Sequence, residues 1–210
     1  MKKELERRFL PCEVRAEAND RGTIITGRPV VYDSRTDLGV FDEIIAKDAL
    51  IGTDLRDVRF LVNHDFNMIP LARSRRNNGN STMTLFVDDN GLGFEANIDT
   101  ENNATARELY SAVQRGDVSG MSFAFSVDGE SWDDIKSEHP LRTITSIASI
   151  VEISAVTFPA YEATSINARS DSEALESARR ALEKARRDAA ESLESERRTL
   201  ELLKAKALNY

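Results

Sequence analysis

An alternating stretch near the middle of the chain reads Val118-Ser119-Gly120-Met121-Ser122-Phe123-Ala124-Phe125. Its large apolar residues at 121, 123 and 125 alternate with the small residues Ser122 and Ala124. This period of two predicts a β-strand with one buried face, on which Ser122 points away from the aromatic rings. A serine held there is either a packed structural residue or a nucleophile on a rigid element. Serine is a weak nucleophile at its free pKa, so the second interpretation requires a neighbouring base.

The sequence around this stretch predicts a mostly-β fold. Runs rich in β-branched and aromatic residues predict strands over 23–32, 58–62 and 141–158. Asn90-Gly91 between two further β-rich runs predicts a hairpin over 82–98. A change of period over 100–115 predicts an amphipathic helix that ends at Gly116. We also expect a short helix or turn over 42–51 and a loop over 126–140.

The C-terminal part of the chain has a different composition. From about residue 171 to 203 it consists largely of Ala, Leu, Glu, Arg and Lys, with no Gly or Pro. Glu-to-Arg pairs four residues apart favour a solvated helix, while Ser192 and Glu196 interrupt the heptad pattern of a coiled coil. We therefore expect an α+β, mostly-β domain over 1–168 and a long charged helix over 169–210.

Charge and composition exclude several classes of protein. The net charge of −8 argues against a general nucleic-acid binder. Cys12 is the only cysteine, which excludes an intramolecular disulfide and a Cys-rich zinc site. The charged segment 1–8 lacks the apolar run of a signal peptide, and no window is apolar for long enough to span a membrane. We expect a soluble protein of a reducing, cytoplasm-like compartment, without a metal, a cofactor, or a nucleic-acid or membrane partner.

Two histidines are candidates for the base. His64 follows the strand predicted over 58–62 and lies between Asn63 and Asp65. Its ordinary pKa near about 6.5 lets it accept a proton at neutral pH, although it could equally bond a loop carbonyl. Asp65 is expected to cap the loop. His139 lies in a polar segment and is expected to be solvated.

A carboxylate in an apolar run is the third candidate. Glu152 lies within Ile150–Val156, where an ionised side chain is costly unless it is paired. It is either an outward-facing strand residue or a group that orients a histidine and stabilises its cation. Ser154 shares its face, which is compatible with both interpretations. Ser119 competes with Ser122 as the functional serine but is more typical of a turn.

Several motifs in order support a resemblance to a known family. They are Asn63-His64-Asp65, Pro70-Leu71-Ala72, the stretch from Gly116 to Phe125, and Glu152-Ile153-Ser154-Ala155-Val156-Thr157-Phe158-Pro159-Ala160. Over residues 5–168 the chain resembles the prohead proteases of tailed bacteriophages, serine proteases of capsid maturation related to the herpesvirus assemblins. It departs from the usual pattern at Ala72 and Ala124, where glycine is common.

The resemblance implies a fold and a site. It implies a closed or nearly closed, herpesvirus-protease-like β-barrel with peripheral helices. It places the nucleophile at Ser122, the general base at His64 and the third member at Glu152. Herpesvirus relatives use a second histidine, for which His139 is the only counterpart; Glu152 is preferred because it lies in the matching motif. Backbone N–H groups, aided by Arg142 or Arg73, would stabilise the oxyanion.

The resemblance also implies partners and a location. The expected substrates are the scaffolding segment of the major capsid protein and the protease itself, inside the immature capsid in the host cytoplasm, without secretion. A homo-oligomer is compatible with the resemblance because active herpesvirus relatives dimerise. The charged C-terminal helix would bind scaffold or capsid-protein helices. The alternatives are a catalytically silent capsid assembly or scaffolding factor on the same fold and, far less favoured, a thiol enzyme built on Cys12 and His64.

Overall fold

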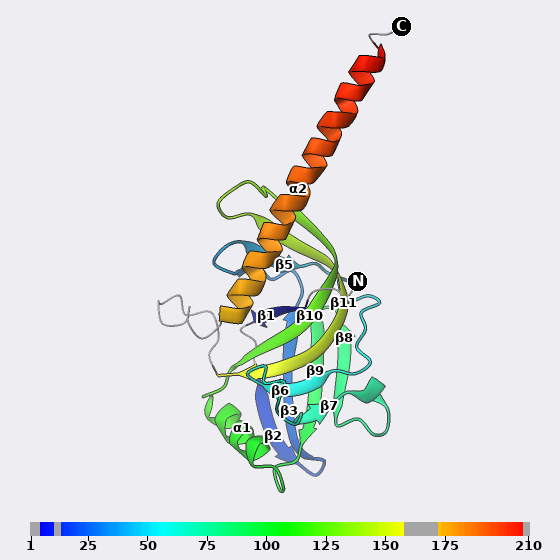
Figure 1. The fold of residues 1–210 in the computed structure, drawn as a ribbon. Helices are drawn as coiled ribbons and strands as arrows, with labels where there is room; N and C mark the ends of the chain where they lie inside the picture. The colour runs from blue at the N-terminus through cyan, green and yellow to red at the C-terminus, as the bar shows by residue number, and fades with distance from the viewer. Residues whose placement is uncertain (1–4, 11–13, 158–171, 208–210) are drawn as a thin grey trace.

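The computed structural model describes residues 5–10, 14–157 and 172–207, which form a mixed α+β fold made mostly of strands (Figure 1). Within these residues a 3-10 turn, η1, covers Arg75–Asn77. The strands and α-helices are, in order, β1 (Glu6–Leu10), β2 (Arg15–Asn19), β3 (Gly22–Val31), β4 (Thr36–Asp37), β5 (Asp42–Ile45), β6 (Arg59–Val62), β7 (Ala72–Arg73), β8 (Met83–Asp88), β9 (Gly91–Ile98), α1 (Ala104–Arg115), β10 (Gly120–Asp133), β11 (Leu141–Val156) and α2 (Ser172–Ala207).

The strands form two sheets. One has seven strands, with the hydrogen-bonded order β1-β10-β11-β5-β4; in addition, β6 pairs with β11, and β7 pairs with β6. The other has four strands in the order β2-β3-β9-β8. Within the described residues no hydrogen-bonded ladder joins the two sheets, so the strands form no closed barrel. The expected mostly-β α+β class is confirmed, whereas the expected barrel is not.

The hydrophobic core lies between the two sheets. Phe60 of β6 contacts Phe94 of β9, with ring centroids 5.2 Å apart. Phe123 and Phe125 of β10 are fully buried and stack on each other, as the alternating pattern predicts. The small side chains of Ser122 and Ala124, which alternate with these rings, lie on the other face of the sheet, because successive residues of a strand point to opposite sides.

Local sequence patterns predicted the β8–β9 hairpin and helix α1 correctly. Gly91 has φ +129°, and a Cβ added there would lie 2.1 Å from the carbonyl oxygen of Val30, so the turn requires glycine. Asn103 caps α1 by accepting a hydrogen bond from the backbone N–H of Ala106. Gly116 ends α1 in the left-handed conformation. The β8–β9 hairpin and α1 are therefore confirmed.

Two local predictions were only partly right. The segment 42–51 begins with strand β5 and continues as turns, because β5 pairs in parallel with the first part of β11. Most of the expected loop over 126–140 belongs to β10, which runs to Asp133. The β10–β11 ladder contains several register shifts, and the β10 residues 127–133 are all half-buried or exposed. That combination removes the regular alternation by which a strand is recognised.

A buried ion cluster joins the N-terminal strand to the rest of the sheet. Arg8 binds Glu43 through two nitrogens, at 2.6 and 2.9 Å, and Arg142 reaches the same carboxylate at 2.9 Å. Glu6 accepts hydrogen bonds from both arginines, and Glu130 accepts from Arg142. Arg8 and Arg142 are almost completely buried. The five side chains thus tie β1, β5, β10 and β11 together; we call them the buried ion cluster.

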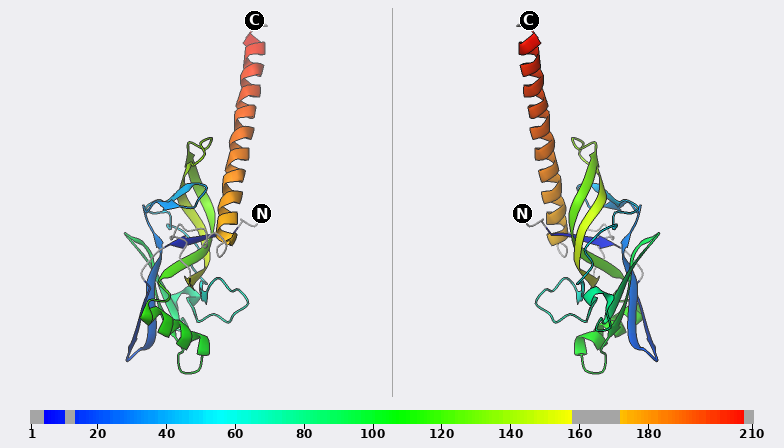
Figure 2. Two further views of the ribbon diagram at one scale, coloured as in Figure 1. Left: turned by 90° about the vertical axis from the view of Figure 1, so that its left-hand side faces the viewer. Right: turned by 90° about the vertical axis from the view of Figure 1, so that its right-hand side faces the viewer.

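The long helix α2 is attached to the body by its first turns. Ala178 and Leu182 pack against Phe41, and Arg186 donates hydrogen bonds to the carbonyl oxygens of Ile135 and Ser137. Beyond this contact the helix projects away from the sheets (Figures 1 and 2). A long C-terminal helix is confirmed, although its first turns are packed rather than solvated. The boundary expected at 168 falls outside the described residues. None of the described helices combines the length and apolar character needed to cross a membrane.

The buried ion cluster makes the stability dependent on pH. Burial alone would raise the pKa of Glu6, but the hydrogen bonds and charges of Arg142 and Arg8 outweigh it, so this pKa lies below its ordinary value of 4.5. A depressed pKa stabilises the fold above the ordinary value, and this stabilisation is lost as the pH falls through the folded-state pKa. We expect Glu6→Gln to lower the free energy of unfolding at pH 7 and to flatten its acid dependence.

Urea unfolding from pH 3 to pH 7 measures both effects. Equal slopes of unfolding free energy against pH for Glu6→Gln and the unsubstituted chain would contradict the role given to Glu6.

Candidate active site

The central strand β11 brings distant parts of the chain together. Ser122 of β10 lies directly opposite Ser154 on one side of β11. On the other side, Leu61 of β6 pairs with the same Ser154 in a parallel ladder. His64 follows the end of β6, so it reaches the same short segment of β11 that carries Glu152. The site is therefore assembled by strand pairing.

The structure places His64 in contact with both Ser122 and Glu152. The Nε2 atom of His64 lies 2.5 Å from the Oγ atom of Ser122, and its Nδ1 atom lies 2.5 Å from Oε1 of Glu152. Ser122 is 2% exposed and Glu152 is 0% exposed. The His64 side chain is 13% exposed. The imidazole thus bridges a buried hydroxyl and a buried carboxylate.

The carboxylate of Glu152 determines which nitrogen of the His64 ring carries the proton. An ionised carboxylate can only accept hydrogen bonds, so a bond from Nδ1 to Glu152 requires the proton to be on Nδ1. In the neutral ring this leaves the lone pair of Nε2 facing the Ser122 hydroxyl. This is the arrangement that a general base requires.

Ser154 supports both the carboxylate and the histidine. Its hydroxyl donates to Oε2 of Glu152 at 2.6 Å, and its oxygen accepts the backbone N–H of His64 at 3.1 Å. Ser154 is completely buried. Strand alternation placed it on the face of Glu152, but the bond to His64 depends on the β6–β11 pairing, which has no local sequence signal. Ser154 is thus a positioning residue that sequence reasoning left unassigned.

The turn that carries His64 has an unusual backbone. Asn63 and His64 have φ values of 50° and 56°, in the left-handed region that non-glycine residues rarely adopt. The side chain of Asn63 accepts the backbone N–H of Thr157 at 3.1 Å, which fixes the turn to the end of β11. Asp65 accepts the N–H of Asn67 and caps the loop, as expected. Such strain persists only where surrounding contacts enforce it, and it concentrates at functional sites.

The other candidate side chains lie elsewhere. Ser119 is exposed and precedes β10. His139 lies 3.3 Å from the carboxylate of Asp42 and 3.5 Å from that of Asp37, and its expected solvated loop position fits its half-exposed side chain. These three residues have the spacing of metal ligands, but Asp42 already binds Arg35. Cys12 lies outside the described residues.

Neither arginine expected at the oxyanion lies at the site. Arg142 belongs to the buried ion cluster, and Glu6, Glu43 and Glu130 raise the pKa of its guanidinium even though burial alone would lower it. Arg73 binds both oxygens of Asp57 at 2.6 Å. Because both charges are engaged with carboxylates, the expectation that either arginine assists at Ser122 is not supported.

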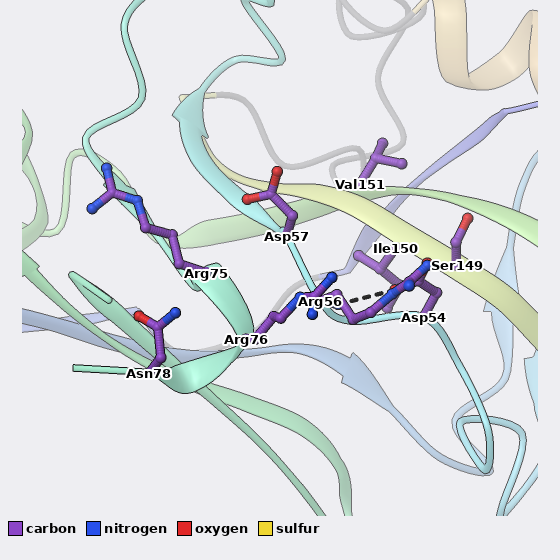
Figure 3. A pocket seen from close by; sticks show the side chains of 9 residues that line it. All are labelled: Asp54, Arg56, Asp57, Arg75, Arg76, Asn78, Ser149, Ile150 and Val151. Carbon is purple, nitrogen blue, oxygen red and sulfur yellow. Dashed lines mark hydrogen bonds and ion pairs between the residues drawn. The ribbon is translucent and has the colours of Figure 1, made fainter. Parts of the chain in front are cut away.

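A separate pocket of about 580 Å³ opens beside β11 (Figure 3). Its lining includes Val151, which precedes Glu152, but none of Ser122, His64 and Glu152. Arg56 binds both oxygens of Asp54, and its hydrogen bonds lower the pKa of that carboxyl to about 2. The charges of Arg56 and Asp54 therefore neutralise each other, and Ser122 is not among the residues that line the pocket.

Comparison with known proteins identifies the family of the chain. Residues 11–178 match the family described as caudovirus prohead serine protease. The chain is 26% identical over 174 residues to the prohead protease of Enterobacteria phage HK97, an overlap of 81% of this chain and 71% of that protein. No solved structure matches. The chain therefore belongs to the caudovirus prohead serine proteases, the bacteriophage serine proteases of capsid maturation.

Proposed function

We propose that this chain is an endopeptidase in which Ser122 is the nucleophile, His64 the general base and Glu152 the residue that orients the histidine. One observation supports this assignment most directly: the His64 ring lies 2.5 Å from both the Ser122 hydroxyl and the Glu152 carboxylate. Three residues far apart in sequence meet there in a buried site. That geometry is the recognition criterion for a catalytic triad on any fold.

The proposed reaction is acyl transfer in two steps. The Ser122 oxygen attacks a peptide carbonyl carbon while Nε2 of His64 takes the hydroxyl proton. His64 then gives this proton to the leaving amine as the peptide bond breaks, and an acyl-enzyme remains. A water molecule attacks the acyl-enzyme while Nε2 of His64 takes a proton from it; His64 then returns this proton to the Ser122 oxygen as the ester bond breaks and the new carboxyl group is released. Glu152 stabilises the imidazolium formed in each step.

The proposed substrates follow from the family. We propose that the protease cuts the scaffolding segment of the major capsid protein, and also itself, inside the immature capsid in the host cytoplasm. The matched relative is described as a prohead protease, which supports a substrate in the assembling capsid. A catalytically silent assembly factor is the alternative, and replacing Ser122 separates the two.

Substitution of Ser122 tests the activity. With Ser122→Ala, we expect a co-expressed major capsid protein and the protease itself to keep their full masses, because no acyl-enzyme can form. With the unsubstituted chain, mass spectrometry should show both trimmed. Ser126→Ala is a matched control: Ser126 is another buried serine of β10, and its hydroxyl bonds Ser149 instead of His64. If the capsid protein and the protease also keep their full masses with the unsubstituted chain, this result would favour the catalytically silent assembly factor.

Substitution of Ser154 tests the positioning of Glu152 and His64. Ser154→Ala removes a hydrogen bond to a buried carboxylate, worth about 1.5–3 kcal/mol, so we expect kcat to fall about ten- to hundredfold. KM should stay unchanged because Ser154 is not expected to touch substrate. The assay uses a peptide that spans a mapped cut site. A change in KM alone, or a kcat equal to that of Ser126→Ala, would contradict this role.

The distal half of α2 is the proposed recruitment element. It exposes four leucines, at positions 193, 200, 202 and 203, beyond the turns that pack on the body. We propose that this segment binds scaffold helices. Deleting residues 191–210 keeps the packed residues Ala178, Leu182 and Arg186. We expect such a chain to retain peptide hydrolysis but to be missing from purified proheads. Equal amounts of both proteins in proheads, measured by quantitative mass spectrometry, would refute recruitment by this segment.

A further inference from the structure

The N-terminal strand β1 covers the Ser122 hydroxyl. It pairs antiparallel with β10, and Phe9 lies opposite Ser122 in the register. The carbonyl oxygen of Arg8 accepts a hydrogen bond from Ser122 Oγ at 2.8 Å. A backbone carbonyl of the protein itself therefore lies at the atom that must attack a substrate carbonyl.

This contact competes with activation of the hydroxyl. A hydroxyl carries one proton, and general-base catalysis requires that proton to be directed at Nε2 of His64. While Ser122 donates to Arg8, its proton is directed at an acceptor that cannot carry it away. Displacing β1 would remove this acceptor and expose Ser122, which is now only 2% exposed.

β1 also contacts the loop that carries the histidine. The guanidinium of Arg7 lies 5.2 Å from the ring centre of Phe66, two residues beyond His64. Arg7 is paired with Ala124, which is opposite Glu152 in the next ladder. The strand therefore occupies the open side of β10 along the same segment that carries Ser122.

We propose that β1 occupies the substrate-binding edge of the protease, and that an extended peptide binds antiparallel to β10 only when β1 leaves. This inference rests on the proposed function and adds a conformation for the substrate and a control on access. A sheet edge recognises an extended chain mainly through its backbone groups. The occupant is thus a flexible segment of the proposed capsid-protein substrate that can adopt a strand.

The buried ion cluster holds β1 in place. Arg8 is clamped on Glu43 by two hydrogen bonds, lies 5.6 Å over the Phe125 ring and reaches Ser177 of α2 at 3.4 Å. Removing one partner of a buried ion pair leaves an uncompensated charge, so it strongly weakens the attachment of β1 through Arg8. Glu43 is the right target, because it binds Arg8 and lies outside β1, β10 and the proposed triad.

The first test weakens the ion pair between Arg8 and Glu43. Glu43→Gln weakens the hold on Arg8, whereas Glu130→Gln removes a carboxylate of the same cluster that bonds Arg142 and not Arg8. We expect Glu43→Gln to raise several-fold the rate at which a fluorophosphonate labels Ser122 and the rate at which purified capsid protein of the same phage is cut. Glu130→Gln should leave both rates near those of the unsubstituted chain. Equal rates for a folded Glu43→Gln and for Glu130→Gln would overturn the inference.

The second test fixes β1 to β10 with a disulfide and does not depend on the first test. Directly opposite residues of an antiparallel pair have Cα atoms about 4.5–5.5 Å apart, within the span of a disulfide. Arg7→Cys with Ala124→Cys, in a Cys12→Ser chain, can therefore tether β1 to β10. We expect oxidation to slow labelling and cutting at least tenfold and reduction to restore both rates, whereas the Ala124→Cys, Cys12→Ser chain should not respond.

The outcomes separate the inference from the function on which it rests. An oxidised chain whose mass confirms the tether, yet which is as fast as the reduced chain, would overturn the inference and leave the protease intact. If Ala124→Cys alone abolishes activity, the comparison of Glu43→Gln with Glu130→Gln decides. Absence of labelling and cutting in every chain, the unsubstituted one included, would contradict the proposed function, and the inference would fall with it.

Discussion

The pairing of one strand with two different neighbours is the constraint on which the rest of the structure depends. The second half of β11 pairs with β10 on one side and with β6 on the other, and both ladders meet at Ser154. The hydroxyl, the imidazole and the carboxylate therefore come from three strands or strand ends of one sheet. A site on rigid paired strands keeps its geometry with little loss of freedom when substrate binds. The left-handed turn at Asn63 and His64 completes this arrangement.

The buried ion cluster links the N-terminal strand, the sheet and the C-terminal helix. Buried ion pairs are weak evidence for stability, because the cost of desolvation offsets much of the attraction. In some proteins, buried ion pairs instead specify one arrangement over others. Here the arginine of β1 contacts Glu43 of β5 and Ser177 of α2. The strand beside Ser122 and the helix that projects from the body are thus held by connected contacts.

Local sequence patterns predicted the elements better than their connections. Alternation through Ser122 predicted β10 and the face of its serine, and Asn90-Gly91 predicted the hairpin. The strand over 42–45 was missed because its stability comes from parallel pairing with β11, which no local pattern encodes. At the site, the contact between Ser122, His64 and Glu152 followed from the family resemblance. Ser154 and β1 were missed as parts of the site because their contacts span 90 and 114 residues.

The protonation state of one ring is the most direct test of the bridging histidine. The chain has only two histidines, so nitrogen NMR of a ¹⁵N-histidine-labelled sample, assigned with His139→Asn, resolves His64. At a pH where the ring is neutral, the structure predicts a proton held on Nδ1 and none on Nε2, with the Nδ1 proton strongly deshielded and this signal lost in Glu152→Gln. A ring protonated on Nε2, or one that exchanges freely between tautomers and is unaffected by Glu152→Gln, would contradict the account.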